Sequence, residues 1–77
     1  MQTVRLSCDR HQLWVDVRVA GLNGRWIASA DAPDGPSLGL AFTPRRALVL
    51  ALEPFEGIIS ELLATAPPDL LEHGAMG

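Results

Sequence analysis

The chain has 77 residues, with six arginines, no lysine and nine acidic residues, giving a formal net charge of −3. A chain this short is one domain with a marginal core, because it buries only about 60–65% of its unfolded surface. The arginines are scattered apart from Arg45–Arg46, so direct nucleic-acid binding is not expected, whereas the acidic balance suits a basic protein partner. No apolar run reaches the ~18–20 residues of a membrane span.

The single cysteine, Cys8, cannot form an intrachain disulfide, and one cysteine alone does not indicate a cysteine-based metal site. One free thiol fits a reducing compartment. The first residues also lack the apolar core of a signal peptide. We therefore expect a cytoplasmic protein that carries no cofactor.

Apolar and polar residues alternate in Val4–Cys8 and again, more clearly, from Leu13 to Val19. This period of two predicts two strands, joined by a polar turn at Asp9–Gln12. The Asn23–Gly24 pair then predicts a two-residue type I′ turn into a third strand, because both residues tolerate positive φ.

That turn fixes the pairing of the second and third strands and makes one face wholly apolar. On this face Val17 lies opposite Ala30, Val19 opposite Ala28, and Trp26 near Gly21. We expect the face to pack against a helix, since its small alanines leave room for helix side chains.

The other face of the predicted hairpin is polar, with Trp14 and Ile27 among its arginines and aspartates. Asp16 would face Asp31 there, which is unfavourable, although Arg18 is a diagonal neighbour of Asp31. Ala32–Ser37, with two prolines and a glycine, is predicted to be a loop. Leu38–Phe42 is predicted to be a short strand, in which Gly39 indicates a bulge or a close backbone approach.

Thr43–Ala66 holds the only long helical pattern. Thr43 is a good N-cap and Pro44 suits the first helical position. One face carries Leu48, Leu52, Phe55, Ile59, Leu62 and Ala66. Pro54 and Gly57 weaken the middle, but the apolar face stays in phase across them. The pattern favours one bent helix, or two short helices nearly in line. The alternative is a hairpin that pairs Leu38–Phe42 with a strand at Ala47–Leu52.

Ala47–Leu52 is apolar on every side, with Val49 and Leu50 facing away from the main helical seam. A helix that is apolar all round is normally buried all round. Val49 and Leu50 either tuck under the C-terminal tail or form a self-association surface, and the short chain favours association.

These elements predict an α+β fold: a three- to four-stranded antiparallel meander with one bent C-terminal helix packed on one face. The domain is expected to span residues 1–74, including one helical turn at Pro68–Glu72, and residues 75–77 are expected to be a disordered tail.

No catalytic or metal-binding motif stands out. Cys8, Asp9 and His11 are close in sequence, but a nucleophile needs a base within hydrogen-bond reach and a third orienting group. His73 has no other ligand type at metal spacing. The carboxylates Glu53, Glu56 and Glu61 are explained by a solvated helix face. Of the two tryptophans, Trp26 is assigned to the core and Trp14 to the surface, where tryptophan is typical of interface anchors.

The run GRWIASADAPDGPSLGLAFTPRRALVLAL resembles the core of the HicB-type antitoxin family. The resemblance covers about Val15 to Leu52. The elements that carry it are a strand at Gly24–Asp31, a proline-glycine loop at Pro33–Gly35, a short strand with Ser37 and Gly39, and a helix with Thr43 and Ala47. It implies a partial RNase-H-like module, dimerisation and toxin neutralisation by contact.

The chain also departs from that family. The spacing from Gly39 to Thr43 is longer than usual, and Arg45–Arg46 replace the usual acidic residues. No DNA-binding segment follows Ala66, so the family's DNA-binding role is not implied. We expect a non-catalytic interaction module that forms a homodimer through Val49, Leu50, Trp14 and Ile27. The alternative is a small enzyme or a ligand-binding domain.

Overall fold

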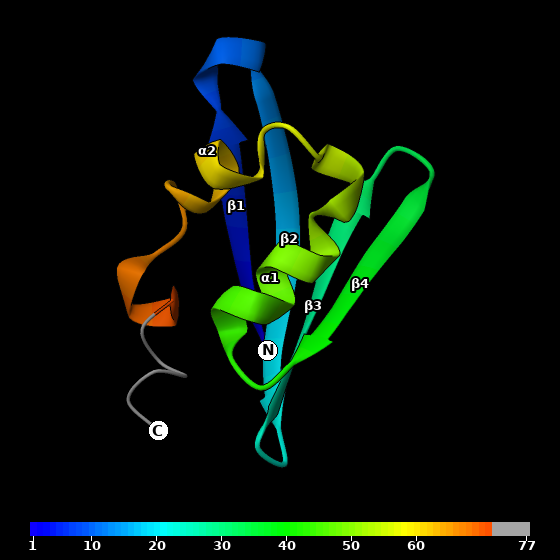
Figure 1. Cartoon of the computed structure of the whole chain (residues 1–77), viewed down its shortest axis with the longest axis vertical. Helices are drawn as coiled ribbons and strands as arrows, with labels where there is room; N and C mark the ends of the chain where they lie inside the picture. Colours follow the sequence, from blue (N-terminus) through cyan, green and yellow to red (C-terminus); the bar gives the residue numbers. More distant parts are fainter. Residues whose placement is uncertain (72–77) are drawn as a thin grey trace.

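The computed structural model describes residues 1–71, so the expected end of the domain and the tail at 75–77 lie outside the described residues. Its sheet is antiparallel, in the order β1 (Gln2–Cys8), β2 (Leu13–Leu22), β3 (Arg25–Ala32) and β4 (Gly35–Ala41). Figure 1 shows β1 and β4 at the two edges of this meander. The predicted α+β fold is confirmed.

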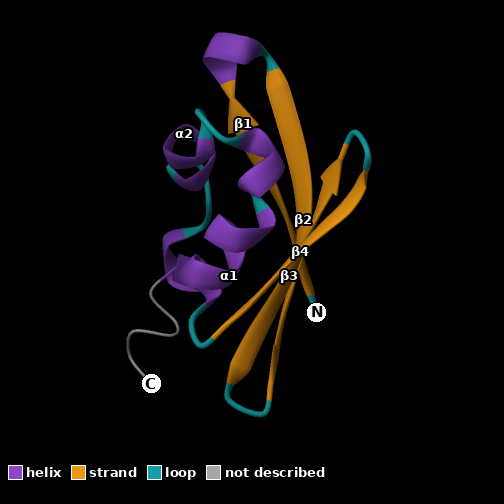
Figure 2. Ribbon diagram, turned by 45° about the vertical axis from the view of Figure 1, so that its right-hand side comes forward, coloured by secondary structure: helices purple, strands orange, loops and turns teal. Residues whose placement is uncertain are grey.

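Helices cover one face of the sheet and leave the other open (Figure 2). The layer consists of α1 (Pro44–Ala51), a 3-10 turn η2 (Glu53–Phe55) and α2 (Ile59–Leu63), and residues 68–71 add one more helical turn. The alternative reading of Ala47–Leu52 as a strand is wrong. The single bent helix is not found either. α1 ends at Ala51, and the chain then turns first at η2 and again at Gly57 before α2 begins.

Pro54 and Gly57 explain these two turns. Pro54 has no N–H for the carbonyl of Leu50, and the chain there tightens into η2, with the N–H of Phe55 bonded to the carbonyl of Leu52 at 2.8 Å. Gly57 has a φ of 99°, which ends the helical path before α2 begins. The apolar seam continues in phase, but it is distributed over separate segments.

The predicted register of β2 and β3 is confirmed, with Val17 paired to Ala30 and Val19 to Ala28 around an Asn23–Gly24 turn. Both turn residues have positive φ, 53° and 78°. The ladder ends at Val17 and Ala30, so the unfavourable Asp16–Asp31 pair does not form.

Each of those two aspartates instead meets an arginine on the outer face of the sheet. Arg5 of β1 pairs with Asp16, with Nε 2.8 Å from Oδ1 and Nη2 3.3 Å from Oδ2. Arg18 Nη1 lies 3.5 Å from Asp31 Oδ1, as its diagonal position predicts. The Arg5 contact lowers the pKa of the Asp16 carboxyl, chiefly through its hydrogen bonds.

The core lies between the inner face of the sheet and the helices. The fully buried members are small on β3, where Ala28 and Ala30 lie, and larger on β1 and β2. The main buried residues are Leu6, Val15, Val17, Val19, Ala28, Ala30, Ala47, Leu48, Ala51, Leu52 and Leu62. The predicted helical seam is buried except at Ile59, which is half-buried. As predicted, Trp26 lies over Gly21 on this face.

The segment Ala32–Ser37, predicted to be a loop, is a tight hairpin instead. Ala32 pairs with Gly35, so that only Pro33 and Asp34 connect β3 to β4. Proline pre-sets the φ of the first turn residue, and Gly35 takes a φ of 122° directly after the turn. The fourth strand therefore begins three residues earlier than Leu38, at Gly35.

The link from the sheet to the helical layer follows the sequence prediction. Thr43 caps α1, its Oγ1 accepting from the N–H of Arg46 at 3.2 Å, and Pro44 is in the first turn. Across residues 1–71, no helix has the length and apolar character needed to cross a bilayer.

Candidate interaction surface

One end of the outer sheet face is apolar. Successive side chains of a strand point to opposite faces, and the pairs Ala20–Ile27 and Ile27–Leu40 align their outward side chains in one row. We define the apolar outer patch as Leu22, Ile27, Leu38, Leu40 and Phe42. Their exposed fractions run from 40% for Ile27 to 73% for Phe42, so none of them belongs to the core.

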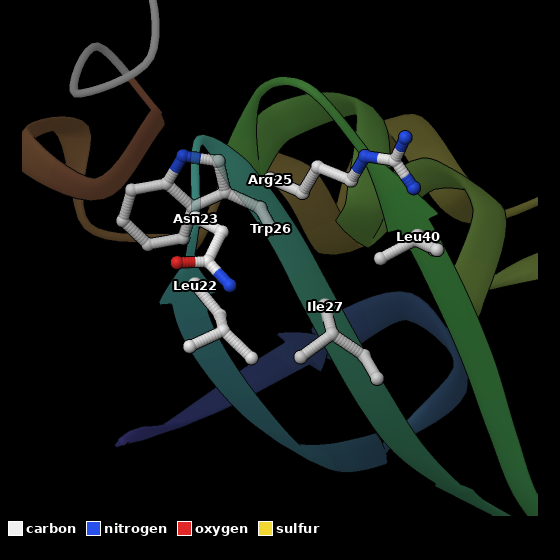
Figure 3. Close-up of a pocket in the computed structure, with 6 residues that line it drawn as sticks. All are labelled: Leu22, Asn23, Arg25, Trp26, Ile27 and Leu40. Carbon is white, nitrogen blue, oxygen red and sulfur yellow. The ribbon is translucent and has the colours of Figure 1, made fainter.

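A shallow hollow of about 460 Å³ lies within this patch, lined by Leu22, Asn23, Arg25, Trp26, Ile27 and Leu40. Figure 3 shows these side chains, with Arg25 extending toward β4. The Arg25 guanidinium lies 5.5 Å from the centre of the Phe42 ring, a cation–π distance. The lining of the hollow is therefore mainly apolar, with the amide of Asn23 and the one positive charge of Arg25.

The patch borders a sheet edge to which no further strand of residues 1–71 is paired. β4 has β3 on one side and no strand on the other. In an antiparallel ladder, alternate residues bond inward and outward, and the tight turn makes Ala32 and Gly35 an inward-bonding pair. Leu38 and Leu40 then direct their backbone N–H and C=O groups away from β3. Pro36, which has no N–H, fits the same outward-facing set.

The opposite edge, at β1, is partly closed. The N–H of Ser7 donates to Thr65 Oγ1 at 3.0 Å, and α2 packs beside β1. The Thr65 hydroxyl in turn donates to the carbonyl of Leu62 at 2.8 Å, which fixes its orientation. The two edges of one small sheet are thus treated differently, and only the β4 edge is both open and apolar.

A second hollow of about 400 Å³ lies at the β4 edge, lined by Leu40, Ala41, Phe42, Thr43, Arg46 and Leu50. It joins the outer face of the sheet to the helical layer, because Leu50 comes from α1. Leu50 is 40% exposed. The apolar surface therefore continues around the β4 edge from Ile27 through Leu40 to Leu50.

The four residues predicted for an interface do not lie together. Ile27 and Leu50 both border Leu40. Val49 is half-buried and packs on the core. Trp14 is 68% exposed, but it lies at the Cys8–Leu13 end of the sheet, where the Arg5 guanidinium is 5.9 Å from its ring centre.

Sequence reasoning missed the residues that connect this surface: Leu22, Leu38, Leu40 and Phe42. The signal was present, since the large residues of LGLAF alternate with Gly39 and Ala41. Pairing this strand with β3 places the glycine and alanine under α1 and the large residues outside.

Cys8 belongs to a separate group at the Asp9–His11 turn. Its buried thiol donates to Glu61 Oε2 at 2.7 Å, and the other carboxylate oxygen accepts from Arg10. The hydrogen bond to Glu61, and then burial, raise the pKa of the Cys8 thiol. Reactive cysteines have a lowered pKa, so this thiol is held in its unreactive form. Asp9 and His11, the predicted neighbours, are exposed.

In the described part of the chain, no three His, Cys, Asp or Glu side chains are grouped closely enough to hold a metal ion, and His73 lies outside it. Comparisons with models of protein families, with characterised proteins and with solved structures find no match. The HicB-type resemblance therefore stays a hypothesis that rests on the sequence alone.

Proposed function

We propose that this protein is a non-catalytic protein-interaction module that works as a homodimer, and that the dimer forms on the β4 side of the sheet. The observation that carries this proposal is the apolar surface that runs from Ile27 through Leu40 to Leu50, beside an open strand edge. Exposed apolar patches of this kind mark interaction sites in soluble domains.

The character of the surface hollows supports a module over the alternative, a small enzyme. The two hollows at β4 and a third beside α2 each contain one titratable side chain, an arginine: Arg25, Arg46 and Arg45. General acid–base catalysis needs a group that gains and loses a proton near neutral pH, which arginine does not do. The Cys8 thiol is likewise kept protonated.

A second copy of the chain is the simplest occupant of this surface. A chain of 77 residues buries a limited share of its own apolar area. A two-fold contact uses the same surface on both copies at once. We place the module in the cytoplasm, where the free thiol of Cys8 stays reduced. A HicB-like antitoxin, acting by contact on a basic protein, remains our hypothesis for the role of the dimer.

The test is the molar mass in solution, measured by light scattering and by sedimentation equilibrium over a range of concentrations. We expect a dimer for the wild type and a monomer for Leu40→Glu and for Leu50→Glu. Trp14→Glu is the matched control, because Trp14 is even more exposed than Leu40 but lies away from β4. A wild type that stays monomeric at millimolar concentration, or a Trp14→Glu variant that alone dissociates, would overturn the proposed surface.

A further inference from the structure

The dimer proposed above has a specific geometry. We propose that β4 pairs edge to edge with β4 of a second copy, so that two four-stranded sheets become one eight-stranded antiparallel sheet with its two-fold axis at Gly39. This inference rests on the proposed function and names the contact by which the two copies join.

The backbone of β4 is the first argument. The edge-facing groups of Leu38 and Leu40 bond to no other residue among residues 1–71. Proteins usually blunt an exposed edge with charged side chains, a bulge or a covering segment. From Gly35 to Ala41 the strand has no charged side chain, and its pairing with β3 is continuous, without a bulge. Pro36, which has no N–H to donate, interrupts this edge only at the end of β4 that lies next to the turn.

The register follows from which residues can bond. A two-fold axis makes the strand pair with itself, antiparallel. With the axis at Gly39, Leu38 of each copy lies opposite Leu40 of the other. The edge-facing N–H and C=O groups of both residues are then all hydrogen-bonded. An axis at Leu38 would place Leu40 opposite a Pro36 that cannot donate. An axis at Leu40 would depend on Phe42, which lies beyond the end of β4 at Ala41.

Side chains on both faces fit this axis. Leu50 lies over Gly39, since a Cβ added to Gly39 would be 2.9 Å from the Leu50 Cβ. The axis therefore brings the two Leu50 side chains together on the helical side, while Leu38 and Leu40 of both copies alternate on the outer side. Stacking the outer patches face to face would bury the patch but leave Leu50 and the β4 backbone exposed.

Amide hydrogen exchange tests the geometry directly. We expect the Leu38 and Leu40 amides to exchange at least about tenfold more slowly at concentrations where the dimer is populated than in the Leu50→Glu monomer. The Thr3 and Arg5 amides face outward from β1 by the same alternation, and they serve as the internal control whose exchange does not change.

Leu38→Pro gives an independent test. It removes one edge-facing N–H at a position where the fold accepts proline, as it does at Pro36. We expect Leu38→Pro to abolish the dimer and the matched Leu38→Ala, which keeps the N–H, only to weaken it. The exchange protection of β3 amides such as Ala28 verifies that both variants fold.

The outcomes separate the two proposals. A wild-type dimer whose Leu38 and Leu40 amides stay unprotected would overturn edge pairing and leave the proposed function standing. A monomer at every concentration would overturn both. Protection of these amides only on addition of an extended peptide would assign the edge to a different chain and overturn the homodimer.

Discussion

The carbonyl oxygen of Ala47 in α1 faces Gly39 of β4 so closely that a Cβ atom added to Gly39 would lie 2.1 Å from it. The same atom would lie 2.7 Å from the backbone nitrogen of Ala51. Both contacts are with helix backbone, which cannot rotate aside as a side chain can. The short distance between α1 and the sheet therefore depends on the absence of a side chain at Gly39.

We predict that Gly39→Ala destabilises the fold by about 1–3 kcal/mol or more, because overpacking forces the backbone of α1 to move. Urea unfolding followed by far-UV circular dichroism measures the loss. Gly21→Ala is the matched control on the same face, since the atoms nearest to its added Cβ belong to the Trp26 side chain, the first at 3.2 Å, and not to helix backbone. A loss as large for Gly21→Ala as for Gly39→Ala would show that the helix backbone is not the limiting contact.

The sequence predicts the first part of the fold well because local rules and burial agree there. Alternation assigns β1 and β2, and the Asn23–Gly24 turn fixes the register with β3. The start of α1 is predictable for the same reason, since Thr43 and Pro44 are a cap and a first-turn residue in any context. Each of these features is settled within a few residues of the chain.

The helical layer and the candidate surface are less predictable, because each depends on contacts distant in sequence. An apolar seam in phase across Pro54 and Gly57 is compatible with one bent helix or with three segments, and packing on the sheet decides between them. The surface around Leu40 depends on the pairing of β4 with β3, which the supposed loop at Ala32–Ser37 obscured. Exposure of Leu50, in contrast, was visible in the pattern of α1.

The cap of α1 allows a second prediction. Thr43→Ala removes the acceptor for the Arg46 N–H and should lower the free energy of unfolding by about 1 kcal/mol. Thr43→Ser keeps the hydroxyl and should retain most of the stability. Chemical denaturation of the three proteins at one pH provides the comparison. Equal losses for alanine and serine would assign the effect to the lost methyl group and its packing.

A third prediction concerns the Cys8 thiol. Its pKa is raised mainly by the hydrogen bond to Glu61, so the native protein should react slowly with iodoacetamide at neutral pH. Glu61→Gln removes the negative charge, should lower the thiol pKa, and should shift the pH profile of alkylation to lower pH. Glu56→Gln, a change at an exposed residue, is the control.

The raised pKa of the Cys8 thiol also makes the stability of the fold depend on pH. A thiol with a raised folded-state pKa contributes stability that is present below the unfolded-state pKa and is lost as pH rises through the folded-state value. The wild type should therefore lose stability toward alkaline pH, and Cys8→Ser should lose less over that range. If Cys8→Ser loses as much stability as the wild type toward alkaline pH, another group is responsible for the loss.

The last prediction concerns the ion pair of Arg5 and Asp16. Hydrogen bonds from Arg5 lower the pKa of Asp16, so the pair contributes stability above the unfolded-state pKa of about 3.9, and that contribution is lost as pH falls through the lower folded-state pKa. Asp16→Asn should be less stable than the wild type at pH 6, and the difference should shrink toward pH 2. Arg5→Gln removes the other partner and should reproduce this convergence, whereas the double variant should add little to either single change. Urea unfolding of the four proteins from pH 2 to pH 6 measures these differences in stability.

Because both side chains are exposed, added salt should also reduce the difference between the wild type and Asp16→Asn at pH 6. A difference that is constant across pH and salt would mean that the two residues stabilise the β1–β2 pair by packing and not by charge.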